Sequence, residues 1–233
     1  LQVQPENFIN LIKKQILIRG RWGYTRGNMS KEEYQSLLND TVLPKYDEIK
    51  HQFIHSGLIR PKVNYGWFPC YKDKERLILQ ADDKEFFFDF PRQNFAPLLC
   101  LTDYFMDKGS KEDVIGLFVV TIGHQASVIT KKVYEEGNYH DYLLMHGFSV
   151  EAAEALAEYT HQVMRDEMGL LFRGERYSFG YSSCPDLSQQ LPLLEILNAE
   201  DIGITLTESC EMVPEQSVSA IVVHHSQASY FSV

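Results

Sequence analysis

A run of β-branched and aromatic residues from Val114 to Thr121, between Asp113 and Gly123, predicts a buried β-strand. Two stretches with helical spacing follow it, residues 125–136 and 139–168. The second of these predicted helices is smooth enough to pack closely against its neighbours, because it carries a group of small side chains: Ala152, Ala153, Ala155 and Ala157. A buried strand beside a long small-residue helix indicates a layered fold with both element types.

The remaining pattern mixes helices and strands without a regular alternation. Ser30 and Glu33 form a capping-box signature at a helix start, and Pro44 suits the first turn of the next helix. The further predicted helices are 5–19, 30–41, 44–57 and 191–198, and the further predicted strands are 63–67, 77–79, 86–90, 204–207 and 219–224. This order favours an α+β fold over a doubly wound sheet. We find no linker or internal repeat, so we expect one domain over 1–233, with 1–60 as its helical part.

Charge and composition limit the classes of partner and the cellular environment that we expect for the chain. The formal net charge is -10, which disfavours nucleic acid and anionic membranes as partners. One basic group, which is either a local patch or a solvated helix face, comprises Lys13, Lys14, Arg19, Arg21 and Arg26. The four cysteines are widely and unevenly spaced, and no leader or long apolar run is present, so we expect reduced thiols in a cytoplasmic protein. Leu1 in place of Met suggests a piece of a longer chain.

Motifs for self-sufficient catalysis are missing. The sequence has no G-x-G-x-x-G after a strand and no G-x-x-x-x-G-K, which disfavours dinucleotide and P-loop sites. The segment 180–184 fails as a nucleophile elbow, because its fifth position is not glycine. His224 and His225 are adjacent, and adjacent residues on a strand point to opposite faces. We therefore predict neither catalytic residues nor a metal site.

A turn-rich segment around Arg176 is the strongest candidate site. Arg176 offers a planar fork that can clamp a carboxylate, and Gly180 lets backbone approach a ligand closely. The alternative is a surface loop in which Arg176 pairs with a neighbouring acid such as Glu175 or Asp186. From the residues alone, both interpretations stay open.

Several short motifs, in a fixed order, resemble the activation domain of cobalamin-dependent methionine synthase. Near the C-terminus they read Arg-x-x-x-Gly-Tyr-x-x-Cys-Pro from Arg176, then Leu-Thr-Glu-Ser from Leu206, Ser-Val-Ser from Ser217 and a final Tyr230-Phe231. Upstream they comprise 66–69, 101–105, 113–116 and 155–161. The likeness therefore spans nearly the whole chain.

This resemblance implies one α+β domain with a twisted, mainly antiparallel sheet that binds S-adenosylmethionine. Such a domain docks on a cobalamin-binding domain, which holds the cobalamin. There it takes part in the reductive remethylation of inactive cob(II)alamin during methionine biosynthesis, with an electron from a flavodoxin-like donor. The isolated chain would then be one part of a methyltransferase system and not a catalyst alone.

The resemblance also assigns roles to individual residues. Arg176 corresponds to the group that grips the ligand carboxylate, and Glu154 to an acid near the site. The expected lining of the ligand site comprises Ser178, Gly180, Tyr181, Tyr230 and Phe231. An aromatic face near a sulfonium is favourable for cation–π reasons. Residue-based alternatives are that Tyr230 is plain core and that Glu154 is a solvated helix acid.

One departure from the family bears on ligand binding. An aspartate that the family uses on the ligand's amino group falls opposite Lys13 or Lys14, and a lysine cannot accept a hydrogen bond from an ammonium. Two competing hypotheses therefore stand beside the first. One is a docking domain of the same fold that has lost ligand binding, and the other is an independent enzyme that uses S-adenosylmethionine.

Overall fold

A six-stranded antiparallel sheet forms the centre of the molecule, in the order β3-β2-β1-β4-β8-β5. The computed structural model describes residues 1–171 and 173–233. The strands are β1 (Lys62–Asp73), β2 (Arg76–Ala81), β3 (Lys84–Asp89), β4 (Asp113–Thr121), β5 (Glu175–Ser178) and β8 (Ser217–Val223), with a separate pair of β6 (Thr205–Leu206) and β7 (Met212–Val213). The helices are α1 (Pro5–Phe8), α2 (Lys31–Leu37), α3 (Leu43–His55), α4 (His124–Glu135), α5 (Tyr139–Glu167) and α6 (Gln190–Ile196).

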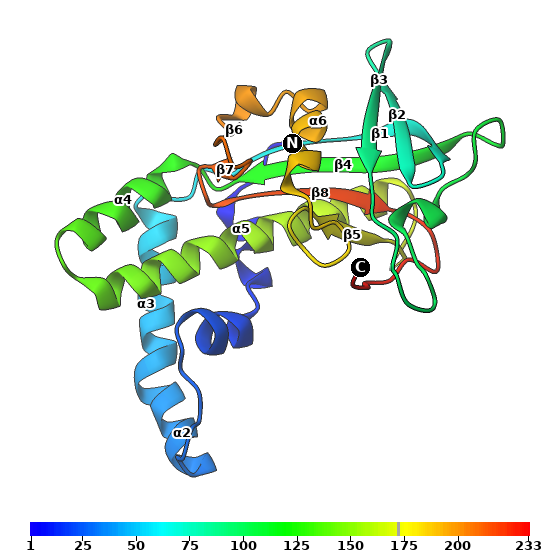
Figure 1. The fold of residues 1–233 in the computed structure, drawn as a ribbon. Coiled ribbons are helices and arrows are strands. Elements are labelled where there is room, and N and C mark those ends of the chain that lie inside the picture. Colours follow the sequence, from blue (N-terminus) through cyan, green and yellow to red (C-terminus); the bar gives the residue numbers. More distant parts are fainter. Residues whose placement is uncertain (172) are drawn as a thin grey trace.

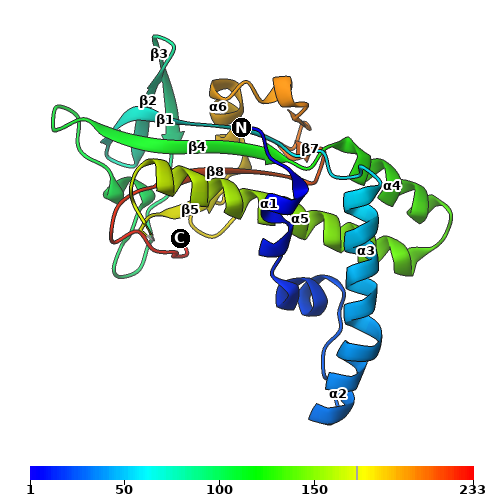
Figure 2. The ribbon, with the colours of Figure 1, turned by 180° about the vertical axis from the view of Figure 1, so that it is seen from behind.

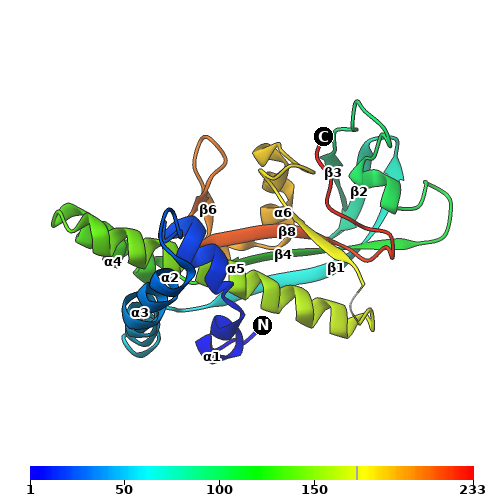
Figure 3. The same ribbon diagram turned by 90° about the horizontal axis from the view of Figure 1, so that it is seen from below.

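Strand β4 organises both layers of the core, because its side chains alternate between the two faces of the sheet. Phe118 and Val120 pack on the face that the long helix α5 covers. Ile115, Leu117 and Val119 pack on the other face, with α6 and the segment around Phe90 and Leu101. Figure 3 shows α5 and α6 on opposite sides of the strands. The predicted α+β class with a mainly antiparallel sheet is confirmed.

The alanines of α5 let this helix approach the sheet closely. Ala152, Ala153 and Ala157 are almost completely buried. At Gly116 of β4, an added Cβ would lie 2.7 Å from Met164 Cε and 2.9 Å from Val222 Cβ. This contact leaves no room for a side chain at position 116, so the glycine fixes the distance between strand and helix.

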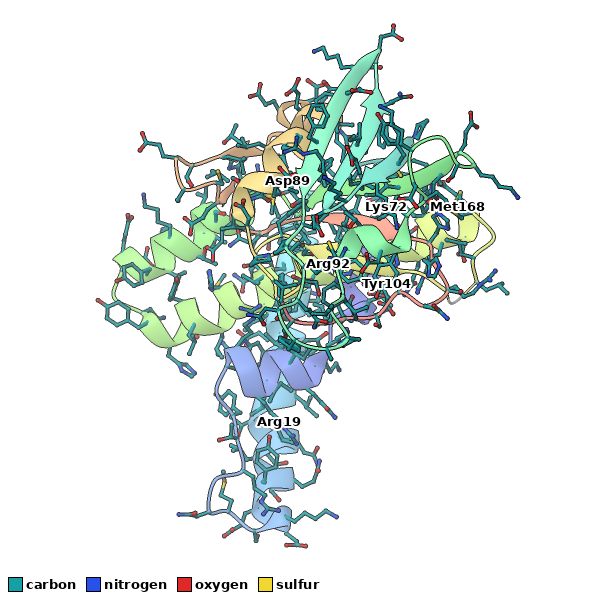
Figure 4. All side chains as sticks on the ribbon, turned by 45° about the vertical axis from the view of Figure 1, so that its right-hand side comes forward. Arg19, Lys72, Asp89, Arg92, Tyr104 and Met168 are labelled. Atoms are coloured by element: carbon teal, nitrogen blue, oxygen red, sulfur yellow. The ribbon has the colours of Figure 1, made fainter. Side chains whose placement is uncertain are left out.

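Residues 16–55, which comprise a π-helical turn, α2 and α3, form an arm that projects from the sheet, as Figures 1 and 2 show. Figure 4 places Arg19 on this arm, away from Arg92 and Tyr104 beside the sheet. α2 and α3 are joined by a π-helical turn, Leu38–Val42, so that the two predicted helices form one nearly continuous rod. Phe148 of α5 connects arm and sheet, because its ring centroid lies 5.0 Å from that of Phe53 on α3.

Two sequence predictions about elements are wrong. The expected continuous helix over 5–19 is broken at Ile12, whose extended ψ of 123° separates α1 and a 3-10 turn (Ile9–Leu11) from a π-helical turn (Ile16–Arg21). The break lets Phe8 and Leu17 both reach full burial. The segment 175–178, expected to be part of a turn-rich loop, is the edge strand β5, paired with β8.

Candidate functional site

A cavity of about 460 Å³ lies where the edge strand β5, the helix α5 and the C-terminal segment meet. Its lining includes six of the seven predicted site residues, Glu154, Arg176, Ser178, Tyr181, Tyr230 and Phe231, together with Lys13, Tyr177, Ser182, Ser183 and Ser232. The structure thus gathers side chains that are more than 200 residues apart in the sequence. We call this space the Arg176 cavity.

Gly180 is the one predicted site residue outside the lining, and it shapes the adjoining turn. Its φ is +82°, in the left-handed region that favours glycine. Its amide donates to the carbonyl of Cys184 at 2.9 Å, and the amide of Cys184 donates to the carbonyl of Tyr181 at 3.0 Å. These bonds close a tight turn that holds Tyr181 and Ser182 at the cavity wall.

Arg176 is already paired within the protein. Its Nη2 donates to Glu154 Oε2 at 3.0 Å, and its Nε lies 3.8 Å from Glu158 Oε2. The side chains of all three residues are partly buried at this contact. Arg176 thus pairs with acids of the protein, as the alternative interpretation held, but these acids are Glu154 and Glu158 on α5 and not Glu175 or Asp186. On a strand, neighbouring side chains point to opposite faces, so Glu175 cannot share the face of Arg176.

The C-terminal segment is bound to β5 and to the following turn. Tyr230 Oη donates to the carbonyl of Arg176 at 2.9 Å, and Tyr177 Oη donates to the carbonyl of Ser229 at 2.8 Å. Ser183 Oγ donates to the carbonyl of Phe231. Tyr230 remains 66% exposed, which contradicts the alternative that it is plain core. Its ring is therefore accessible from the cavity.

Three acids on one face of α5 supply the negative charge of the site, and only Glu154 among them was predicted from the sequence. Glu151, Glu154 and Glu158 follow the spacing i, i+3, i+7, which places side chains on one helical face and could have revealed them. Glu151 is buried and accepts from Arg21 Nε at 3.0 Å. Proximity of Glu154 raises the pKa of Tyr181 above its usual value of 10.0.

The basic group predicted from the sequence does not form one patch. Lys13 lines the Arg176 cavity, whereas Lys14 Nζ lies 4.5 Å from the centre of the Tyr46 ring. Arg19 lies over Tyr34 on the arm. The two adjacent lysines therefore face different parts of the molecule.

His161 of α5 is a buried imidazole close to this charged cluster. It is 3% exposed, and its Nε2 has no hydrogen-bond partner among the described residues. Burial, with the charge of Arg165, lowers the pKa of His161 to about 4 from its usual value of 6.5. The neutral ring is therefore the form that the fold accommodates.

This depressed pKa predicts a loss of stability in weak acid. The pKa of His161 is lower in the folded state than in the unfolded state. The contribution of its neutral ring to the free energy of unfolding is therefore fully present above pH 6.5 and is lost as the pH falls through about 4. We expect the urea midpoint of the wild-type chain to fall between pH 7 and pH 4.5, and that of His161→Gln to fall less. The exposed His140, replaced in the same way, is the control. An equal fall of the urea midpoint in the wild type and in both variants would contradict the prediction that His161 causes part of this loss.

The comparisons with known proteins identify the family of the chain. Residues 24–233 match the model of the family described as vitamin B12 dependent methionine synthase, activation domain. The chain belongs to this family. The resemblance that its motifs predicted is thereby confirmed.

Its curated relatives are much longer than the chain. It is 29% identical over 260 residues to the methionine synthase of Mycobacterium leprae, and 30% identical over 260 residues to that of Mycobacterium tuberculosis. Each alignment covers 97% of this chain and 22% of the relative, so the chain spans about a fifth of their length.

A solved structure shares the fold of this activation domain. It is described as the MetH reactivation domain bound to AdoHcy, and it matches with a TM-score of 0.78 at 20% sequence identity. The match covers 100% of this chain and 79% of that chain. Because the identity is low, the match establishes the architecture of the chain and not its ligand contacts.

Proposed function

We propose that this activation domain binds S-adenosylmethionine in the Arg176 cavity and docks on a cobalamin-binding domain for reductive remethylation of inactive cob(II)alamin. The observation that carries the proposal is the convergence of Arg176, Glu154 and the pair Tyr230 and Phe231 on one cavity of about 460 Å³. Membership of the family and a neighbour described as bound to AdoHcy support it. A cavity of this size is in the range of small-molecule sites.

The charged groups of the cavity fit the amino-acid end of that ligand. Arg176 presents its guanidinium to a carboxylate, once the ligand has replaced Glu154 as its partner. Glu154, released from Arg176, is then an acceptor for the ligand's ammonium group. The protein exchanges one ion pair for two, so no buried charge is left without a partner.

The aromatic residues fit the sulfonium and the adenosyl group. Tyr181 and Tyr230 are both more than half exposed, at 62% and 66%, so their ring faces are available to a ligand. A ring face beside a sulfonium cation is attractive through its quadrupole. Ser178 ends the strand β5 at the cavity wall, and Gly180 keeps the next turn tight, so backbone groups there can reach the ligand.

The proposed role requires binding and orientation more than acid–base chemistry. S-adenosylmethionine carries its own activated methyl group, and cobalamin, held by the partner domain, supplies the metal that receives it. We therefore assign no catalytic residue to the chain. Its contribution is to hold the sulfonium methyl in a fixed position and to exclude water around it.

A second, larger hollow of about 840 Å³ offers a docking surface for the partner. It shares Glu154, Ser178 and Tyr181 with the Arg176 cavity. From there it extends along α5 past Tyr142 and His146 to the segment 213–219. A cobalamin-binding domain seated in this hollow would lie directly against a ligand in the cavity. A flavodoxin-like protein is the proposed electron donor.

Isothermal titration of the chain with S-adenosylmethionine tests this proposal. We expect saturable heat at ligand concentrations up to millimolar. Heat indistinguishable from buffer dilution would favour the docking domain that has lost ligand binding. Methyl transfer by the isolated chain to a small acceptor would instead favour an independent enzyme.

A further inference from the structure

Lys13 is an exposed cation at the wall of the Arg176 cavity, and it differs from the two arginines nearby in its pairing. Arg21 is paired with Glu151 and Arg176 with Glu154, each at 3.0 Å. Among the residues that the structure describes, Lys13 forms no ion pair. An ammonium at a cavity wall that has no ion-pair partner attracts an anionic group of a bound ligand.

The position of Lys13 also allows contact with such a group. It lines the Arg176 cavity and a smaller adjoining cavity of about 190 Å³, which is lined in addition by Glu151, Glu158 and Arg176. Lys13 follows Ile12, where the chain turns away from the first helical segment. Lys14, the next residue, lies over the ring of Tyr46 and lines neither cavity.

Electrostatics assigns Lys13 to the carboxylate end of the ligand. The acids Glu154 and Glu158 lie on α5 beside Arg176, and they attract an ammonium group. A ligand ammonium near these acids leaves its α-carboxylate to the cations. Arg176 shares its guanidinium with two acids, whereas Lys13 forms no ion pair with a residue that the structure describes.

We propose that Lys13 determines specificity for a free α-carboxylate, which it binds together with Arg176. This inference rests on the proposed function, since it concerns the same cavity. There, Lys13 discriminates between a ligand that carries the α-carboxylate and one that lacks it. A lysine in this role favours ligands that carry the carboxylate. It disfavours those with only the amine, because two ammonium groups repel each other.

The test compares S-adenosylmethionine with its decarboxylated form, which keeps the sulfonium and the amine but lacks the carboxylate. Both are titrated into the wild-type chain, Lys13→Gln and the matched control Lys14→Gln. We expect Lys13→Gln to lower the affinity for S-adenosylmethionine about fivefold to tenfold, the effect of losing a solvent-accessible charge-assisted hydrogen bond. Affinity for the decarboxylated form should stay unchanged or improve, and Lys14→Gln should leave both affinities within about twofold.

The possible failures are distinguishable. If Lys13→Gln binds S-adenosylmethionine as tightly as the wild type, or more tightly, Lys13 does not bind the carboxylate and the inference is overturned while the proposed function stands. An equal loss for both ligands overturns it too, since the effect is then not specific to the carboxylate. If the wild-type chain binds neither compound, the proposed function fails and the inference fails with it.

Discussion

Replacing Arg176 by alanine is expected to weaken S-adenosylmethionine binding by about 1.5–3 kcal/mol, or roughly 10- to 150-fold. The substitution removes the planar fork for the carboxylate. It also leaves Glu154 without its cation and Glu158 with Arg165 alone, so that both acids repel the incoming carboxylate more strongly. Both effects act in the same direction. Isothermal titration of the wild type and the variant measures the loss.

The control for this variant is Arg173→Ala, which removes an exposed arginine just before the strand β5. We expect it to bind as the wild type does. Thermal melts of both variants show whether they fold. A well-folded Arg176→Ala with less than a twofold change in affinity would mean that the carboxylate lies elsewhere or that the domain acts by docking alone.

Replacing Phe148 by alanine is expected to destabilise the chain by about 3–5 kcal/mol, the cost of removing a fully buried aromatic ring. The ring lies 5.0 Å from Phe53 and 5.9 Å from Tyr46 between centroids, so it joins the helical arm to α5. We propose that residues 1–60 and the sheet form one folding unit. The variant should then unfold in a single transition with a lower midpoint.

Denaturant unfolding followed by circular dichroism and by tryptophan fluorescence checks this expectation. Trp22 reports on the N-terminal part and Trp67 on the sheet. Leu143→Ala, at a 44% exposed position on the same helix, is the control and should cost far less. Two separate transitions in the wild type, only one of them shifted by Phe148→Ala, would show that the arm is independent.

The central layers of the fold could be predicted from the sequence, because their patterns are strong. The apolar run of β4 and the alanines of α5 are buried as expected. The polar turn at 81–83 joins β2 and β3, with Asp82 and Asp83 both at positive φ. In each case local residue preference and tertiary packing favour the same structure.

The edge strand and the broken N-terminal helix could not be predicted in this way. β5 has four residues, and Tyr177 is the only apolar one and the only one fully buried. Its sequence therefore shows no alternation of apolar and polar residues that would predict a strand. Its strand conformation depends on pairing with β8, which is about 40 residues away. At the N-terminus, helical spacing suggested one helix, but tertiary packing favours a break at Ile12.

The members of the candidate site were predicted from motif order, whereas their pairing was not. The contact between Arg176 and Glu154 joins residues 22 apart on different elements, so the nearby Glu175 and Asp186 were the more obvious partners. The alternation of side chains along β5 turns Arg176 toward α5. Lys13 lines the cavity whereas Lys14 lies over the ring of Tyr46, a difference that their adjacent positions in the sequence do not reveal.

A crystal structure of the chain with S-adenosylhomocysteine tests the ligand assignment most directly. The account predicts a ligand in the Arg176 cavity, its carboxylate on the guanidinium of Arg176, its ammonium beside Glu154, and Tyr230 and Phe231 along its side. A cavity without ligand at saturating concentration, or a guanidinium still paired with Glu154 while the ligand lies elsewhere, would contradict it.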